Sequence, residues 1–480
     1  MTFVYFYSVL KKLLIVSLFL LKVVLGFSQD EYALAHSNYA PSKTFLINPT
    51  NTLDNKVWLD VNIIGVGTYL YNDYVFLPKD EFSLVPHFVQ GKEWPNYQYD
   101  PGTDRKSGFQ DADIQFVSFA TQFKEHGFGF SSRARTYADF RRITPEVATL
   151  IAQGTENYSD YYDQIISANK MFMNQMAYTE FAFSYSNMFY HFAHKTMGAG
   201  ITAKYLVGIT GAGIRIDEID YNVQNPVNTD FLALNGAVGY AAPTGVNGNS
   251  TGSGFAVDLG FVYKKTLHNV THYEPYSEAS ACQPYDYKYK ITAAIIDLGY
   301  IAYKRDAILY DIESTMNSAT LTGNEFTFDG FGSFASQNFN STSSPSFTML
   351  TPAALNLGLD VNYENYYFLS AQVMHGFFRT NALGVKRPDV WALSGRYQRK
   401  WYEGSAVLSL YDYDNLRLGV AFRLGYLTVG SDKLLSFFNV RDFYGTDAYF
   451  NLRFFLGKRP GCARKEKSGN KRNAADCVKD

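Results

Sequence analysis

Strict alternation of apolar and polar residues is the clearest pattern in the chain, and it is strongest near the C-terminal end. Along residues 416–424 every second residue is apolar and large, and the opposite face carries Arg417 and Arg423. Residues 448–456 repeat the pattern, with Arg453 on the polar face. Because successive side chains of a strand point to opposite faces, both segments are predicted to be strands at the seam where a barrel closes.

Two architectures fit this alternation. In a soluble sandwich the apolar faces would form the core, whereas in a membrane barrel they meet lipid and the arginines line a wet lumen. After the first 29 residues there is no run of about 18 apolar residues, so a spanning helix is excluded. In lipid only a closed barrel then satisfies every backbone group. The 38 Tyr and 39 Phe, within an aromatic share of 17%, suit interfacial girdles, and we predict an all-β, single antiparallel transmembrane β-barrel.

Alternating segments recur throughout the predicted barrel, residues 57–457. We expect about fourteen strands, roughly twelve to sixteen, because single-chain bacterial barrels favour even numbers. Gly65 and Gly67 indicate a bulge in the first strand. Besides the two closing strands, the predicted strands are 57–69, 113–124, 127–140, 177–189, 196–208, 213–223, 232–240, 254–264, 290–303, 353–363, 366–378, 390–401 and 404–411.

The first 28 residues have the composition of a signal peptide. Lys11 and Lys12 precede an apolar run at 13–27, and Gly26-Phe27-Ser28 supplies small residues for cleavage. An anchor helix is the alternative, but the run is short for about 30 Å of hydrocarbon. We therefore predict export, with the mature chain beginning near residue 29.

Residues 29–56 lack sustained alternation and contain Asn48-Pro49-Thr50, in which proline forces an extended or turn conformation on the residue before it. We interpret this segment as a plug that folds into the lumen or stays in the periplasm. An ordinary linker is the alternative, because a lone Asn-Pro is a common turn.

The remaining segments are predicted to be loops and a tail. Residues 71–111 and 304–351 read as long outer loops, and Thr144 to Gly154 reads as a loop helix with Pro145 at its first position. Residues 458–480 carry eight basic residues against three acidic ones and are predicted to be a basic periplasmic tail. Cys282, Cys462 and Cys477 form no disulfide framework.

Several short motifs resemble those of the FadL/PorV-like outer-membrane β-barrels. They are Asn48-Pro49-Thr50, the strand at 254–263, Asp297-Leu298-Gly299-Tyr300 and the finish at 449–457. Within that group the chain is most similar to an uncharacterised Bacteroidetes-type outer-membrane family. The usual plug motif there is Asn-Pro-Ala, and Thr50 departs from it. The resemblance implies a plugged barrel of about fourteen strands that either carries hydrophobic molecules or binds proteins in type IX secretion.

The favoured function is binding or passive transport of a hydrophobic small molecule through the plugged lumen of the Gram-negative outer membrane. The expected partners are outer-membrane lipid and that molecule, and a net charge of -2 argues against nucleic acid. The alternative is a non-enzymatic scaffold or shuttle in type IX secretion or outer-membrane assembly. The candidate ligand-binding residues are Asn48, Pro49, Asp60, Asp258, Asp297, Arg417, Arg423 and Arg453, although lumen charges also commonly pair with each other.

Enzymatic activity is not expected, and neither is a cofactor or a metal. His191 with His194, and His268 with His272, have spacings that a helix could use for a metal, but they fall at a strand end and in a connection.

Overall fold

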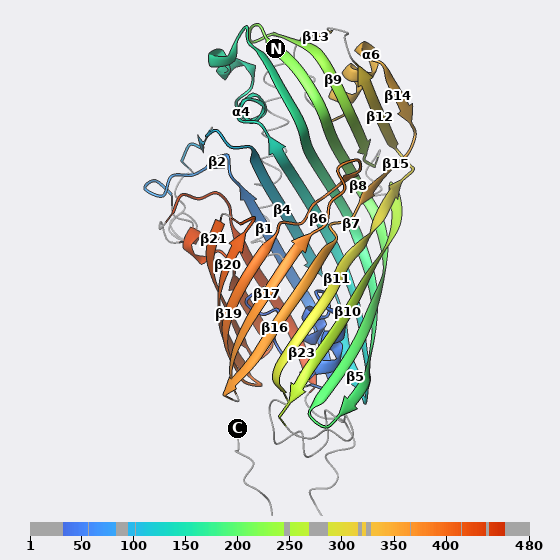
Figure 1. The fold of residues 1–480 in the computed structure, drawn as a ribbon, viewed down its shortest axis with the longest axis vertical. Helices are drawn as coiled ribbons and strands as arrows, with labels where there is room; N and C mark the ends of the chain where they lie inside the picture. Colours follow the sequence, from blue (N-terminus) through green and yellow to red (C-terminus); the bar gives the residue numbers. More distant parts are fainter. Residues whose placement is uncertain are drawn as a thin grey trace, which may run out of the picture.

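The computed structural model forms a closed antiparallel barrel of 14 strands (Figure 1). It describes residues 32–456 except 56, 83–94, 101, 244–249, 268–286, 315–318, 323–327, 365, 414 and 438–440. The predicted signal peptide and basic tail, His268, His272 and the three cysteines lie outside the described residues. Around the wall the strands are β1 (Leu59–Asn72), β4 with β5 (Lys106–Gln115, Ser118–Phe123), β6 (His126–Ile143), β7 (Ile165–Phe192), β8 (Lys195–Val223), β10 (Gly252–Thr266), β11 (Tyr287–Tyr303), β16 (Ala354–Glu364), β17 (Tyr367–Gly376), β19 (Val390–Gln398), β20 (Tyr402–Tyr411), β21 (Asn415–Leu424), β22 (Leu427–Ser431) and β23 (Asp447–Leu456).

The barrel closes between its first and last strands. β1 pairs with β23 from Leu59 opposite Leu456 to Tyr69 opposite Asp447. The register shifts between Asn62 and Ile64, slightly before the predicted bulge. Closure leaves no strand edge in this ring, as a barrel in lipid requires.

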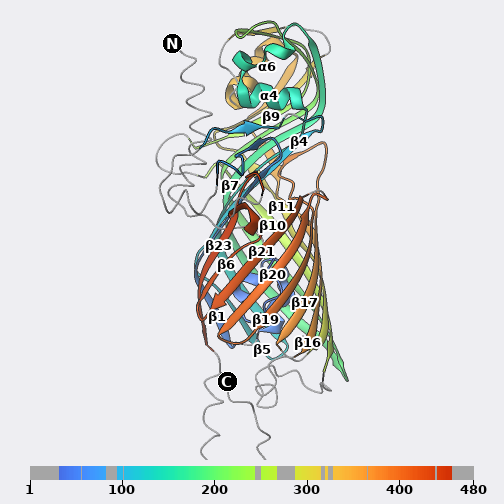
Figure 2. The same cartoon turned by 90° about the vertical axis from the view of Figure 1, so that its left-hand side faces the viewer.

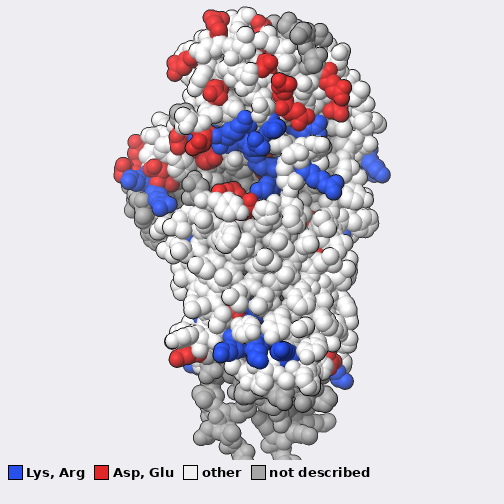
Figure 3. All heavy atoms as spheres, in the orientation of Figure 1, with Lys and Arg blue, Asp and Glu red and all other residues white. Residues whose placement is uncertain are grey.

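The apolar faces of the strands point outward and the charged faces point inward. Phe422 and Phe454 are 54% and 43% exposed, whereas Arg417 and Arg453 are 4% and 2% exposed. On the face that Figure 3 shows, the middle of the barrel carries almost no charged side chain. This arrangement is the inverse of a soluble protein and confirms the predicted transmembrane barrel.

Several strands continue beyond the barrel at one end, which we call the extended end. β7 has 28 residues and β8 has 29, and the far half of β8 leaves the ring to pair with β9. Figure 2 shows helices α4 and α6 against this extension. The elements outside the ring are β2 (Val75–Phe76), β3 (Gln98–Tyr99), β9 (Asn228–Ala241), β12 (Ala307–Ser314), β13 (Ala319–Thr322), β14 (Ser341–Ser344), β15 (Phe347–Leu350), β18 (Leu383–Gly384), α4 (Pro145–Gln153), α6 (Phe328–Asn338), η2 (Thr155–Asn157), η3 (Ser159–Tyr161) and η4 (Leu434–Phe437).

The extension explains most of the wrong strand predictions. Residues 196–208 and 213–223 form one strand, β8, because the residues between them continue the strand through a bulge at Ile209 and do not form a turn. A Cβ on Gly211 would come within 2.4 Å of the Tyr303 ring, so glycine is needed for this ring to pack. Residues 165–176 are strand rather than loop, and 304–351 contains four strands and a helix. β22 was not predicted, and β9 lies outside the ring.

The connections differ in length between the two ends of the barrel. At the end opposite the extension, β5–β6, β7–β8 and β21–β22 are joined by two residues each, while 267–286 is a longer connection at that same end. The loop helix is α4, which begins after Thr144 and ends before Gly154 as predicted, although the Thr144 side chain makes no capping hydrogen bond. Among the described residues, no helix is long and apolar enough to cross a membrane.

Candidate functional site

The N-terminal segment, residues 32–55, lies inside the barrel near the end opposite the extension (Figure 1). It contains the short helices α2 (Pro41–Thr44) and η1 (Pro49–Asp54). The wall holds its backbone: Ser42 N donates to Asp60 at 3.0 Å, and the side-chain amides of Gln115 and Asn356 donate to the Ser42 and Ile47 carbonyls at 3.0 and 2.9 Å. The segment therefore obstructs this half of the lumen.

The Asn48-Pro49-Thr50 motif shapes the turn at the centre of this segment. The Asn48 side chain accepts from Thr50 N at 3.0 Å and from the Thr50 hydroxyl at 2.7 Å, while Pro49 begins η1. Glycines in the wall make room for the turn, because a Cβ on Gly260 would lie 2.3 Å from Asn48 Oδ1 and one on Gly200 would lie 2.9 Å from Pro49 Cβ. The threonine thus adds a hydrogen bond that an alanine there would lack.

A network of ion pairs crosses the middle of the lumen. Asp297 on β11 meets Arg135 at 2.9 Å, Lys204 at 2.7 Å and Arg387 at 2.8 Å, so a single carboxylate joins three cations. Lys204 also meets Asp258 at 2.7 Å. Glu180 on β7 completes the network through Arg133 and Arg135, the latter at 2.7 Å. Buried charges of this kind are stable only when paired, and here each carboxylate has a cationic partner.

Asp297 also interrupts the regular backbone of β11. Its φ is +54°, in the left-handed region that a non-glycine residue adopts at a cost of roughly 1–3 kcal/mol. The register between β10 and β11 shifts at this point, and Asp297 N donates to Asp258 at 2.7 Å. The bulge also changes which residues face inward, so that Ile296 is buried while Leu298 and Tyr300 are exposed.

A second set of ion pairs lies beside the N-terminal segment. Arg453 meets Asp60 at 3.1 Å and also donates to the Tyr39 carbonyl at 2.9 Å. Arg423 meets Glu403 at 3.0 Å, and Glu403 in turn accepts from the Ser37 hydroxyl at 2.8 Å. These pairs connect the segment to β1, β20, β21 and β23.

Toward the extended end, the interior of the barrel changes from charged to apolar and aromatic. Side chains from most of the wall strands meet there, and the Tyr69 and Tyr411 rings stack at 5.6 Å. We call this cluster the aromatic layer. Its larger members are Tyr69, Phe109, Tyr137, Met176, Tyr178, Leu206, Ile301, Tyr303, Phe347, Met349, Met374, Leu383, Val385, Val390, Tyr411 and Tyr449.

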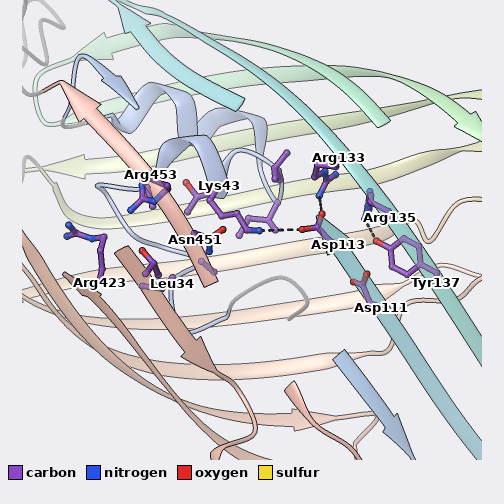
Figure 4. Close-up of a pocket in the computed structure, with 16 residues that line it drawn as sticks. Leu34, Lys43, Asp111, Asp113, Arg133, Arg135, Tyr137, Arg423, Asn451 and Arg453 are labelled. Atoms are coloured by element: carbon purple, nitrogen blue, oxygen red, sulfur yellow. Dashed lines mark hydrogen bonds and ion pairs between the residues drawn. The ribbon is translucent and has the colours of Figure 1, made fainter. Parts of the chain in front are cut away.

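A narrow cavity separates the N-terminal segment from the wall (Figure 4). The centres of water molecules fit in about 40 Å³ of it, which is room for a few waters and not for a larger solute. Lys43 reaches across it to Asp113 at 3.6 Å, and Arg133 meets the same carboxylate at 3.5 Å. These ion pairs therefore narrow the space between the N-terminal segment and the wall.

All eight residues predicted to form the site are buried in the barrel interior. They do not form one site: Asn48 and Pro49 are in the N-terminal segment, Asp60, Arg423 and Arg453 are beside it, Asp258 and Asp297 are in the central network, and Arg417 is in the aromatic layer. Their role in ligand binding stays a prediction.

Sequence reasoning missed several other buried charged residues that take part in the ion pairs of the lumen. They are Arg133, Arg135, Glu180, Lys204, Asp360, Arg387, Arg396 and Glu403. In β6 the arginines alternate with serine and alanine rather than with large apolar residues, so the pattern there is weaker. The charged residues at 133 and 135, two positions apart, and at 180 could still have indicated that these side chains face the lumen.

Of the histidines considered for metal binding, the structure describes His191 and His194. His191 lies at the end of β7 and His194 in the turn that follows. The described part of the chain contains no group of three or more His, Cys, Asp or Glu side chains that could hold a metal.

Comparison with known proteins gives one family and several remote structural likenesses. Residues 49–432 match the model of a family described as a family of unknown function (DUF5723). No curated protein sequence matches the chain. Among solved structures, a mutant of the TodX monoaromatic hydrocarbon channel has a TM-score of 0.43 at 10% identity and covers 89% of this chain and 97% of its own. A Pseudomonas aeruginosa FadL homologue has a TM-score of 0.38 at 10% identity, covering 89% and 98%. Likeness at this level does not establish what the barrel carries.

Proposed function

The chain belongs to a family of unknown function (DUF5723), and we propose that it is an outer-membrane barrel that binds a hydrophobic small molecule and carries it across the membrane. The aromatic layer is the observation that supports this proposal. A water-filled general channel has a polar lumen, whereas here a large apolar and aromatic cluster fills part of the interior toward the extended end. An apolar solute gains free energy by leaving water for such a surface.

In this proposal the N-terminal segment is the plug. Its support is the set of hydrogen bonds that tie its backbone to Asp60, Gln115, Asn356 and Arg453. Asn48 and Pro49 give the plug its turn, and Asp60 and Arg453 hold it against the wall. These residues thus stabilise the closed state. A solute leaves the aromatic layer only when the plug or the wall rearranges.

We place the extended end outside the cell and the end with two-residue turns in the periplasm. The short turns of bacterial outer-membrane barrels are periplasmic and their long loops are extracellular, which supports this orientation. The scaffold role in secretion stays a prediction, because no contact among the described residues favours it.

Uptake of an apolar and a polar solute by cells tests the proposal. Cells that produce the protein in their outer membrane should take up naphthalene faster than cells without it, while arabinose uptake should be unchanged. Leu206→Gln puts a polar group into the aromatic layer, where Leu206 is 1% exposed, and should lower naphthalene uptake several-fold. Leu393→Phe, on the lipid-facing side, is the matched control and should leave uptake unchanged.

The wild type and both variants must be present in the outer membrane in equal amounts of folded barrel. Heat-modifiable mobility on gels measures these amounts. Faster arabinose uptake with unchanged naphthalene uptake would contradict the proposal and indicate a polar channel instead.

A further inference from the structure

Two buried cations at the extended end of the lumen have no carboxylate partner. Arg417 on β21 is 4% exposed, and its Nε and Nη2 have no hydrogen-bond partner among the described residues. The Lys433 amine, two residues after β22, is also buried without one. Elsewhere in the described lumen the cations of the central network are paired with carboxylates, so this pair is an exception that needs an explanation.

The two cations share one aromatic wall. The Arg417 guanidinium lies 3.6 Å from the centre of the Tyr411 ring and 4.7 Å from that of Tyr71. The Lys433 amine lies 5.3 Å from the same Tyr71 ring. Cation–π contacts contribute at most about 2 kcal/mol each, which is less than the cost of burying a charge. The tyrosines therefore position the two cations without neutralising them.

Two of the nearby carboxylates accept hydrogen bonds from other groups. Asp432 accepts from Tyr32 N at 2.8 Å, and Asp412 accepts from Asp389 N at 2.9 Å. Burial and the Arg417 charge lower the pKa of the Lys433 amine well below its usual value, and Asp447 only partly opposes this. An anion near both groups would raise the pKa of the Lys433 amine and so oppose the effect of the Arg417 charge, because a nearby opposite charge favours the protonated amine.

A third potential donor belongs to a residue whose ring contacts the Arg417 guanidinium. The Tyr411 hydroxyl is buried without a hydrogen-bond partner among the described residues, although its ring stacks on Tyr69. The Tyr69 hydroxyl accepts from Arg417 Nη1 at 2.5 Å, which fixes the guanidinium and directs its free edge away from Tyr69. A planar guanidinium with two free N–H groups matches two oxygens of one anion.

We propose that Arg417 and Lys433, with the Tyr411 hydroxyl, form a binding site for a single compact oxyanion such as phosphate at the extended end of the lumen. The anion is either a free ion or the headgroup of an amphiphile, and both offer the same oxygens. This site does not depend on the proposed transport of a hydrophobic molecule, because it rests only on the unpaired donors.

Thermal unfolding of the full mature chain in a non-ionic detergent tests the site. Inorganic phosphate should raise the melting temperature above that in chloride at equal ionic strength, because a ligand that binds only the folded state stabilises it. Arg417→Gln and Lys433→Gln should each weaken phosphate binding by about tenfold or more, as measured by calorimetry. Lys304→Gln, which removes a charge from an exposed position, is the matched control and should bind phosphate as the wild type does.

Two further measurements keep the test decisive. Without phosphate, Lys433→Gln should be at least as stable as the wild type, because it removes one of two like charges; a large loss of stability would contradict an unfilled anion site. Dodecyl phosphate should bind tighter than inorganic phosphate if the source is a headgroup, and equally if it is a free ion, with dodecanol as the uncharged probe. Equal binding of all three probes, or phosphate binding that both variants retain, would overturn the proposal.

Discussion

At the scale of single residues, the interior is organised by charges that have to be neutralised inside a membrane. Asp297 is the clearest case, because three cations share its carboxylate and its backbone is held in the left-handed region. A strained residue persists only where its surroundings determine it, and here the three ion pairs and the hydrogen bond to Asp258 do so. The cations would otherwise repel each other across the lumen.

Replacing Asp297 by asparagine should strongly destabilise the barrel. The change leaves Arg135, Lys204 and Arg387 with one negative charge fewer, and breaking a buried pair costs about 3–5 kcal/mol. Denaturant unfolding in detergent micelles measures this loss. Asp306→Asn is the matched control, since Asp306 also has a positive φ, +48°, but is exposed. An equal effect of both substitutions would show that backbone strain, and not charge, decides.

At the scale of elements, the loop between β17 and β19, residues 377–389, packs into the interior of the barrel. Leu383 and Val385 of this loop are buried in the aromatic layer. Its short strand β18 pairs in parallel with β15, and Gly384 N donates to the Asn174 side chain at 3.2 Å. Arg387 then ties the loop to Asp297. The loop thus crosses from one wall of the barrel to the other.

A disulfide should lock this loop. A Cβ placed on Gly213 lies 3.4 Å from Leu383 Cβ, close to the separation of about 3.5–4.5 Å in disulfides. Leu383→Cys with Gly213→Cys, in a chain whose three native cysteines are serines, should cross-link on oxidation and change mobility on non-reducing gels. Naphthalene uptake should fall and return with reductant, while Leu383→Cys alone should show neither effect. If naphthalene uptake is the same with and without the cross-link, the loop does not move during passage.

At the scale of the whole molecule, the alternation of the strands was enough to predict the barrel and the orientation of its side chains. The predicted seam was right only for residues 448–456, in β23, which pairs with β1, whereas residues 416–424 are in β21, between β20 and β22. Residues 416–424 and 448–456 carry this information locally, because every second residue must face lipid. The extension was missed because residues 213–223 and 232–240, although predicted to be strands, were assigned to the ring, and the alternation of one strand does not show where the strand leaves the ring. Ion-pair partners were missed for another reason: their proximity depends on register across the lumen, which no single segment encodes.

The membrane assignment predicts the effect of a charge on the outer surface. Leu393, in the middle of β19, is 62% exposed, so Leu393→Arg should lower the free energy of unfolding in lipid vesicles by about 2–4 kcal/mol. Leu393→Phe should be nearly neutral. A soluble protein would tolerate arginine at such an exposed position, and a neutral result for Leu393→Arg would therefore contradict a lipid-facing surface.

The division of β8 has a consequence for how this architecture can vary. β8 pairs with β10 as far as Gly208, which lies opposite Gly252. The ring is therefore complete without the residues of β8 beyond Gly208. β9, which pairs with the far half of β8, and β12 to β14 are excursions between wall strands that are already neighbours. These segments can lengthen, shorten or be exchanged without altering the ring of wall strands. The part of the molecule that meets the surroundings is thus free to diversify while the membrane-embedded part stays the same.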